Sequence, residues 1–226
     1  ESMGQSPTFS VKHQMHLTLE RQAYTHPLLR GIIANSRMVA DDLQFRYGIP
    51  AGKIRVVHTG LPSRPAGSWT KEQARAQLNL APAARVILFA GHHYERKGLG
   101  TLLEAIAQTD GGTSRHRDTE PTQQWTVLVA GKGDVPQFQL MARESGILDR
   151  VRFYGPRDLG ELFAAADLFV LPTRYDPFAR VCLEAARAGL PVVTTRRNGF
   201  CEFVGPTEGS VMEYPILVQA LELFGK

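Results

Sequence analysis

Residues 168–194 read LFVLPTRYDPFARVCLEAARAGLPVVT, and this stretch decides the fold class. It begins with an apolar run, Leu168–Leu171, and ends with a second one, Pro191–Thr194. Between the two runs, Arg180–Ala188 has the pattern of a short helix. A short apolar strand followed by a helix and another apolar strand is typical of a buried parallel sheet.

The same alternation of strand and helix extends through most of the chain. Further strands are predicted at Val86–Ala90, Trp125–Ala130 and Val151–Tyr154, and further helices at Leu99–Ala107, Val135–Glu144 and Leu159–Ala166. We therefore predict an α/β fold, a Rossmann-like parallel sheet with helices on both faces. Such sheets bind ligands at the carboxyl ends of their strands. The residues that stand at those ends are Gly91, Gly131, Gly155 and Pro172.

The first 62 residues are less regular. Helices are expected at Val11–Tyr24 and from Ser36, a good N-cap, to Tyr47, and strands at Gly31–Ala34 and Lys53–His58. A linker rich in proline and glycine lies near Leu61–Thr70, so we predict two units, residues 1–62 and 63–226. The polar segment Asp110–Gln124 is expected to be an exposed loop. Because the last helix is barely formed before Lys226, we expect the second unit to be truncated at its C-terminus.

Composition narrows the function class. The net charge of +4 is dispersed along the chain of 226 residues, whereas a nucleic-acid-binding protein concentrates its cations in a stripe. A few well-placed cations suffice for a polyphosphate ligand or for a position beside anionic lipid. Cys182 and Cys201 form no Cys-x-x-Cys pair and are expected to be reduced thiols of a cytoplasmic protein. No apolar run is long enough to span a bilayer, and the start does not resemble a signal peptide.

Two acidic residues in the opening segment are candidate ligand-binding groups. Asp176 follows a strand, and Glu184 lies about two turns into the next helix if that helix begins near Phe178. A helix N-terminus at this edge favours an anion such as a diphosphate, through the backbone N–H groups of Phe178, Ala179, Arg180 and Val181. A carboxylate nearby can accept hydrogen bonds from a pair of sugar hydroxyls. The spacing alone fits equally well with two solvated acids on an ordinary strand–loop–helix.

A second candidate segment, Gly91-His-His-Tyr-Glu-Arg-Lys-Gly98, follows the first strand of the sheet. Arg96 can bind a diphosphate through two hydrogen bonds and Lys97 as a point charge, although a solvated basic turn has the same appearance. The segment is not a Walker A loop, which needs Gly-x-x-x-x-Gly-Lys-Ser/Thr. His92 has a histidine neighbour but no third ligand in a plausible pattern, so no metal is expected.

Together these segments resemble glycosyltransferase family four, retaining enzymes of the GT-B fold. The matching residues are Pro172-Thr, Asp176, Phe178, Leu183-Glu-Ala185 and Gly189-Leu-Pro-Val-Val193, with Lys97-Gly98 before an apolar helix. The variant Arg174–Phe178 is similar to the lipopolysaccharide-core glucosyltransferases. Two positions depart from the family: Asp176 replaces the usual glutamate, and His92 stands where many members have an arginine, a role that Arg96 would take.

The resemblance runs from about Leu17 to about Val204 and implies the C-terminal half of a GT-B enzyme. Residues 1–62 would be the tail end of the N-terminal acceptor domain with the crossing between domains, and residues 63–226 the domain that binds the nucleotide-sugar donor. It implies transfer of a sugar, with retention, from an NDP-sugar to a glycan or lipid-linked acceptor, and the lipopolysaccharide-like variant favours UDP. Glu184 would hold the ribose, Asp176 would contact the sugar, and Arg96 and Lys97 would stabilise the leaving diphosphate. Other implied donor contacts are Gly91, His92, Gly131 and Arg157, the last by stacking on the base, unless it is a plain surface arginine. Asn198-Gly199 with Glu202 would form a structural turn.

The resemblance also has implications for cofactors and partners, and it leaves other functions to be considered. No cofactor, metal or nucleic acid is expected, and the absent acceptor domain would provide any peripheral contact with the inner membrane. A non-catalytic nucleotide-binding or regulatory module of the same fold remains an alternative. A dinucleotide-binding oxidoreductase would need Gly-x-Gly-x-x-Gly after the first strand, which Gly91–Arg96 does not supply. A phosphorylase of related fold would need a cofactor-binding lysine pattern that the chain lacks.

Overall fold

The computed structural model describes residues 11–63, 69–111, 124–205 and 209–212. The chain forms two compact units, Glu1–His58 and Thr59–Lys226. The boundary predicted after residue 62 lies four residues beyond this division. Most of the predicted loop Asp110–Gln124, and the helix predicted before Lys226, fall outside the described residues.

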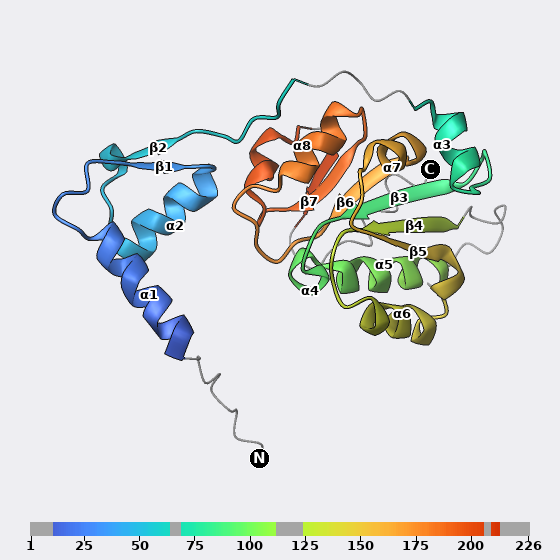
Figure 1. The fold of residues 1–226 in the computed structure, drawn as a ribbon, viewed down its shortest axis with the longest axis horizontal. Helices are drawn as coiled ribbons and strands as arrows, with labels where there is room; N and C mark the ends of the chain where they lie inside the picture. Colours follow the sequence, from blue (N-terminus) through green and yellow to red (C-terminus); the bar gives the residue numbers. More distant parts are fainter. Residues whose placement is uncertain (1–10, 64–68, 112–123, 206–208, 213–226) are drawn as a thin grey trace, which may run out of the picture. The chain divides into compact units, whose positions relative to one another are not determined.

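The second unit is built on a six-stranded sheet in which every pair of neighbouring strands is parallel. Its order is β5-β4-β3-β6-β7-β8, so the direction in which strands are added reverses between β3 and β6 (Figure 1). The strands are β3 (Arg85–Ala90), β4 (Trp125–Ala130), β5 (Val151–Gly155), β6 (Leu168–Leu171), β7 (Val192–Thr195) and β8 (Gly209–Met212). Ligands of doubly wound sheets bind at such a reversal, beyond the carboxyl ends of the strands.

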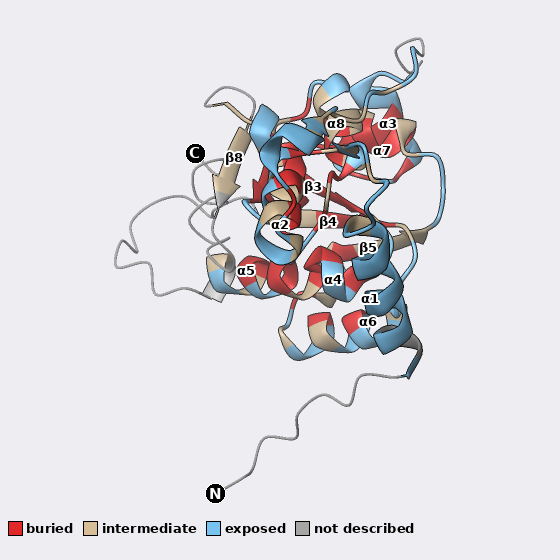
Figure 2. Ribbon diagram, turned by 90° about the vertical axis from the view of Figure 1, so that its left-hand side faces the viewer, coloured by how far each residue is buried: buried red, intermediate tan, exposed pale blue. Residues whose placement is uncertain are grey.

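Helices cover both faces of this sheet. In Figure 2, α5 and α6 lie on one face and α3, α7 and α8 on the other, and the buried strands lie between them. The α-helices in the described part of the second unit are α3 (Lys71–Gln77), α4 (Tyr94–Lys97), α5 (Leu99–Gly111), α6 (Val135–Glu144), α7 (Gly160–Ala165) and α8 (Arg180–Arg187). Residues 86–89 of β3 have no exposed surface, which explains why these positions are all apolar rather than alternately apolar and polar. The predicted α/β fold is therefore confirmed.

The first unit is a small α/β segment. It consists of α1 (Val11–Tyr24), β1 (Ile32–Ala34), α2 (Arg37–Tyr47), a 3-10 turn (Ala51–Lys53) and β2 (Ile54–Val56). Strands β1 and β2 pair in parallel. Ser36 caps α2 as predicted, because its hydroxyl accepts a hydrogen bond from the Val39 N–H at 3.2 Å.

Two α-helices and one strand in the described part of the second unit were not predicted, namely α3, α4 and β8. Helix α3 has a sequence signal, a capping box in which Thr70 and Gln73 each accept a hydrogen bond from the other's backbone N–H. Buried Arg75 holds α3 against the sheet by a bidentate bond to Asp167 at 2.9 and 3.0 Å. Asp167 also accepts from the Val86 N–H, so this contact fixes the starts of β3 and β6 at the edge opposite the ligand-binding one.

Candidate functional site

Loops from three strands meet at the point where the strand order reverses. The Arg174 N–H, beyond β6, donates to the carbonyl of Arg96, beyond β3, at 2.9 Å. The Asp176 N–H donates to the carbonyl of Arg197, beyond β7, at 2.8 Å. The two predicted segments are thus neighbours in space, and a third loop that carried no predicted ligand group joins them.

Glycines allow these loops to approach one another. Gly98 has a φ of +82°, and a Cβ at this position would lie 2.0 Å from the carbonyl oxygen of Pro172. Gly131 has a φ of +114°, and its Cβ would lie 1.9 Å from the carbonyl oxygen of Gly91. Only glycine fits such a backbone contact. Gly98, at the end of α4, and Gly131, after β4, therefore permit these close backbone contacts.

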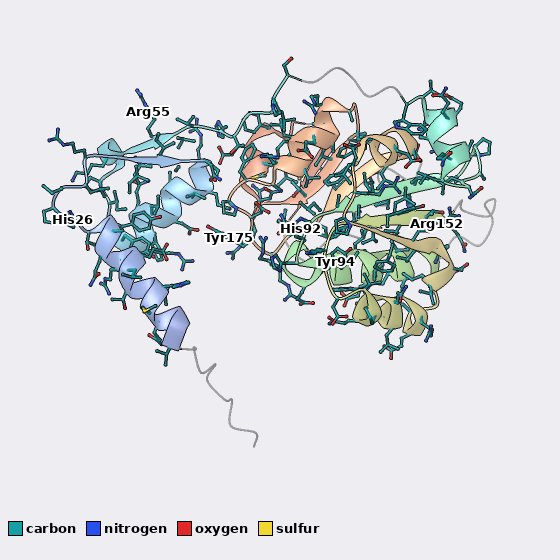
Figure 3. The ribbon with its side chains drawn as sticks, viewed as in Figure 1. His26, Arg55, His92, Tyr94, Arg152 and Tyr175 are labelled. Atoms are coloured by element: carbon teal, nitrogen blue, oxygen red, sulfur yellow. The ribbon has the colours of Figure 1, made fainter. Side chains whose placement is uncertain are left out.

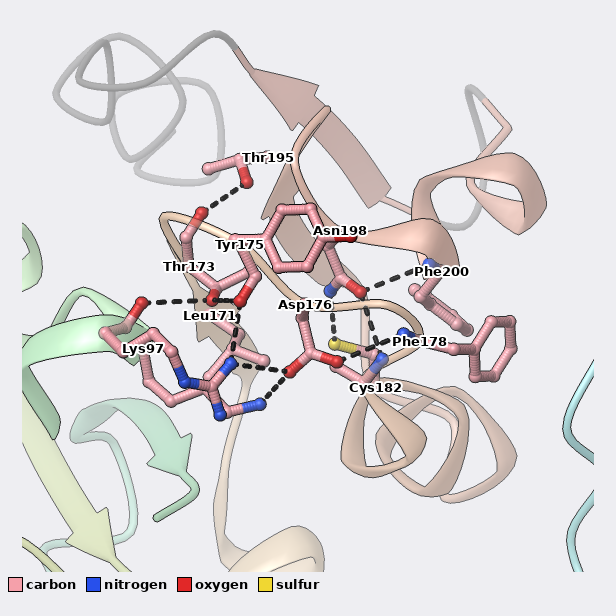
Figure 4. A network of polar contacts seen from close by, with 12 residues as sticks. Lys97, Leu171, Thr173, Tyr175, Asp176, Phe178, Cys182, Thr195, Asn198 and Phe200 are labelled. Carbon is pink, nitrogen blue, oxygen red and sulfur yellow. Dashed lines mark hydrogen bonds and ion pairs between the residues drawn. The ribbon is translucent and has the colours of Figure 1, made fainter. Parts of the chain in front are cut away.

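Lys97 and Asp176 form the centre of the site. The Lys97 ammonium group binds Oδ2 of Asp176, and the two side chains are only 10% and 9% exposed. Arg96 places a guanidinium nitrogen 3.8 Å from the same oxygen and donates to the Tyr175 carbonyl at 2.7 Å. Oδ1 of Asp176 accepts from the Phe178 N–H at 3.1 Å (Figure 4). The alternative of a solvated acid is therefore wrong for Asp176.

Helix α8 begins at Arg180 rather than near Phe178, so Glu184 lies only about one turn from its start. The N–H groups of Phe178 and Ala179 are already bound to the side-chain oxygens of Asp176 and Asn198, both at 3.1 Å. Within the described residues, the N–H groups of Arg180 and Val181 have no hydrogen-bond partner. Two of the four predicted anion-binding N–H groups are thus open to a ligand in this structure.

The remaining predicted residues make contacts of their own. Glu184 is 27% exposed at its side chain and lies 3.8 Å from Arg180. Nδ1 of His92 accepts from the Lys132 N–H at 3.1 Å, which connects the loop after β3 to the turn after β4. Arg157 pairs with Glu161, and its guanidinium carbon lies 5.4 Å from the ring centre of Tyr154.

Tyr94, which was not predicted from the sequence, supports the turn that contains Gly131 and Gly133. Its hydroxyl donates to the Gly131 carbonyl at 2.9 Å, and the residue is 1% exposed. A Cβ at Gly133 would lie 2.2 Å from its ring. His92 lies on the loop that follows β3, and Tyr94 is the first residue of α4 (Figure 3). The sequence did contain a signal for Tyr94, namely an aromatic residue between two polar neighbours in the segment that follows a strand.

The described residues lack two further features. Across residues 11–63, 69–111, 124–205 and 209–212, histidine, cysteine, aspartate and glutamate nowhere form a group of three or more that can hold a metal ion. In those same ranges, no helix is both long and apolar enough to cross a bilayer.

The sequence matches the models of two known families. A family model described as "Glycosyl transferases group 1" matches residues 84–221, more than half of the chain. The chain belongs to this glycosyl transferase family. A second model, described as "Glycosyltransferase Family 4", matches residues 5–63. The predicted resemblance to glycosyltransferase family four is therefore confirmed.

Individual proteins agree with this membership. D-inositol 3-phosphate glycosyltransferase 1 of Catenulispora acidiphila is 32% identical over 177 residues, which cover 74% of this chain and 41% of that protein. WaaG, a glycosyltransferase involved in lipopolysaccharide biosynthesis, superposes with a TM-score of 0.79 at 23% identity, over 95% of this chain and 58% of WaaG. This likeness confirms the GT-B fold.

A second solved structure contains a nucleotide. Alr3699/HepE of Anabaena, solved in complex with UDP and glucose, has a TM-score of 0.69 and 25% identity, over 86% of this chain and 53% of that one. This glycosyl transferase chain spans about two fifths of the length of the curated relative from Catenulispora and somewhat more than half of the two solved chains.

Proposed function

We propose that this chain supplies the donor-binding part of an enzyme that transfers a sugar, with retention, from an NDP-sugar to a glycan or lipid-linked acceptor. The observation that carries the proposal is the meeting of Arg96, Lys97 and the start of α8 where the strand order reverses. Cations and open N–H groups at this edge suit a diphosphate. The Anabaena relative, which was solved with UDP and glucose, supports UDP as the nucleotide.

The proposed chemistry follows from where charge develops. Cleavage of the bond between sugar and phosphate leaves negative charge on the diphosphate, so groups that bind this charge lower the barrier. These groups are Arg96, Lys97 and the N–H groups of Arg180 and Val181. The diphosphate would replace Asp176 beside Lys97, which frees the Asp176 carboxylate to orient the sugar while Glu184 holds the ribose. Gly91, His92, Gly131 and Arg157 would border the rest of the donor.

The remainder of the proposal concerns the whole enzyme. The acceptor and the group that takes its proton would come from a second domain, and catalysis would need no metal. The enzyme would act in the cytoplasm on a bacterial envelope glycan, with peripheral contact to the inner membrane through that second domain.

Calorimetric titration with UDP and GDP tests the proposal directly. We expect UDP to bind more tightly than GDP, and the Glu184→Ala variant to bind UDP more weakly than wild type. The exposed Glu144, at the end of α6, provides the matched control Glu144→Ala, which should bind as wild type does. A folded sample that binds no nucleotide at millimolar concentration would rule out the assignment.

The alternative, a non-catalytic nucleotide-binding module, needs a second measurement. A full-length protein that contains this chain should release UDP from a UDP-sugar in the presence of acceptor extract. If nucleotide binds but no UDP-sugar is turned over, the regulatory module is the better assignment.

A further inference from the structure

The side-chain amide of Asn198 is buried and uses its full hydrogen-bonding capacity. Asn198 has no exposed surface. Oδ1 accepts from the backbone N–H groups of Ala179 and Phe200, both at 3.1 Å. Nδ2 donates to the hydroxyl of Thr194 at 2.9 Å and to the sulfur of Cys182 at 3.4 Å (Figure 4). Four groups, from β7, from the start of α8 and from the turn that Asn198 caps, therefore converge on one amide.

The chemistry of the partners fixes how this amide is oriented. Backbone N–H groups can only donate, so the atom that two of them share must be the oxygen. The Thr194 hydroxyl donates its own hydrogen to the Leu171 carbonyl at 2.9 Å and so offers a lone pair to Asn198. Burial raises the pKa of Cys182 to about 12, so its sulfur stays protonated. The contacts are consistent with one orientation only.

The backbone of Asn198 is attached to the candidate site as well. Asp176 and Asn198 pair as in a parallel ladder. The Asp176 N–H donates to the Arg197 carbonyl at 2.8 Å, and the Gly199 N–H donates to the Asp176 carbonyl at 3.0 Å. The turn after β7 thus holds the loop that carries Asp176 through the backbone, and it holds the start of α8 through the Asn198 side chain.

We propose that Asn198 is a positioning residue for the donor diphosphate. It does not touch the ligand itself. Its backbone pairs with the loop that carries Asp176, and its side chain, by binding the Ala179 N–H, leaves the N–H groups of Arg180 and Val181 as those that meet the anion. This inference rests on the proposed function, because it assumes that the diphosphate binds at this edge of the sheet.

The test compares UDP with UMP on the full chain by calorimetry. The ratio of their dissociation constants reports the contribution of the second phosphate. A fall in the folded fraction affects both nucleotides equally and leaves the ratio unchanged. We expect the Asn198→Ala variant to lose about tenfold in preference for UDP. The control Ile106→Val, in the buried core of α5, should lower the melting temperature but leave the ratio as in wild type.

A second variant keeps the test independent of whether Asn198→Ala folds. Thr194→Val removes one acceptor of the amide, so we expect a smaller loss in the ratio of about threefold. In the double variant the loss should not exceed that of Asn198→Ala alone, because the two residues act through one contact. An unchanged ratio in folded Asn198→Ala, or in Thr194→Val if the former does not fold, overturns the inference, and so do additive losses. A wild-type chain that binds neither nucleotide overturns the proposed function and the inference with it.

Discussion

Lys97 and Asp176 form an ion pair between loops that are 79 residues apart in the sequence, and both side chains are about nine-tenths buried. The pair joins the loops beyond β3 and β6, the two strands between which the order of the sheet reverses. Removing one partner of a buried pair leaves the other charge without compensation in a region of low polarity. The pair therefore determines both the stability of this edge and the charge that a ligand meets there.

Replacement of Lys97 by methionine should destabilise the chain. We expect the Lys97→Met variant to lose about 3 kcal/mol in the free energy of unfolding, because the Asp176 carboxylate stays buried without its counter-charge. Urea denaturation measures this loss. The matched control is Lys71→Met, whose pair with Asp167 is 45% exposed at the lysine and should cost less than about 1 kcal/mol. Equal losses in the two variants would contradict a buried pair at Lys97.

Replacement of Asp176 by asparagine should strengthen nucleotide binding. In wild type the diphosphate must displace the Asp176 carboxylate from Lys97, whereas in Asp176→Asn the ammonium group has no anionic partner. We expect UDP to bind about fivefold more tightly by calorimetry, while sugar transfer by the full-length enzyme falls.

The control for this change is Asp149→Asn. Asp149 is exposed and precedes β5, at the opposite end of the strands. The Asp149→Asn substitution therefore produces the same change in net charge without affecting Lys97. Its UDP affinity should equal that of wild type. Weaker UDP binding by Asp176→Asn would show that Asp176 does not compete with the diphosphate.

An alanine at Gly98 should disrupt the contact between the two loops. Its Cβ would lie 2.0 Å from the Pro172 carbonyl oxygen, so the Gly98→Ala variant should lose about 3 kcal/mol in the free energy of unfolding. Gly146 provides a clean comparison, since it also has a positive φ, +70°, but has no atom within 4 Å of an added Cβ. Gly146→Ala should lose only about 1 kcal/mol, the cost of backbone strain. Denaturation midpoints that fall equally would refute the role of close contact at Gly98.

The buried thiol of Cys182 should make stability depend on alkaline pH. Burial raises its pKa from 9.0 to about 12 in the folded chain, so the unfolded state loses this proton first as the pH rises. The contribution of this pKa shift to the free energy of unfolding is therefore complete below pH 9. It is lost between pH 9 and 12, at no more than about 1.4 kcal/mol per pH unit.

Urea unfolding at pH 8, 9.5 and 10.5 tests this dependence. The Cys182→Ala variant should lose stability less steeply over this range than wild type does. Burial also raises the pKa of Cys201, so Cys201→Ala is the comparison for the second thiol. Parallel slopes for wild type and Cys182→Ala would exclude a contribution from Cys182.

Local pattern was sufficient for most of the fold. The apolar runs at Trp125–Ala130 and Leu168–Leu171 became β4 and β6 with the predicted bounds, since strands buried on both faces are apolar throughout. Helix α3 was missed although its capping box is present in the sequence. Strand β8 was missed because Gly209–Met212 lacks a long apolar run, and its place is set by pairing with β7.

The candidate site was predicted by residue type and not by contact. Arg96, Lys97 and Asp176 were singled out, but nothing in the sequence indicated that Lys97 and Asp176 bind each other. Asn198 was expected to be part of a plain structural turn, yet its amide determines which N–H groups at the start of α8 remain open. Such contacts depend on atoms from loops that only the folded sheet brings together.

The sequence by itself determined the kinds of element, the glycines at the strand ends and the glycosyl transferase family, because these depend on local periodicity and on short motifs. Only the tertiary structure decided the order β5-β4-β3-β6-β7-β8, the burial of Asp176 against Lys97 and the attachment of α8 to Asn198. The physical reason is that parallel strands pair across long stretches of chain. No short segment specifies its own neighbour in the sheet.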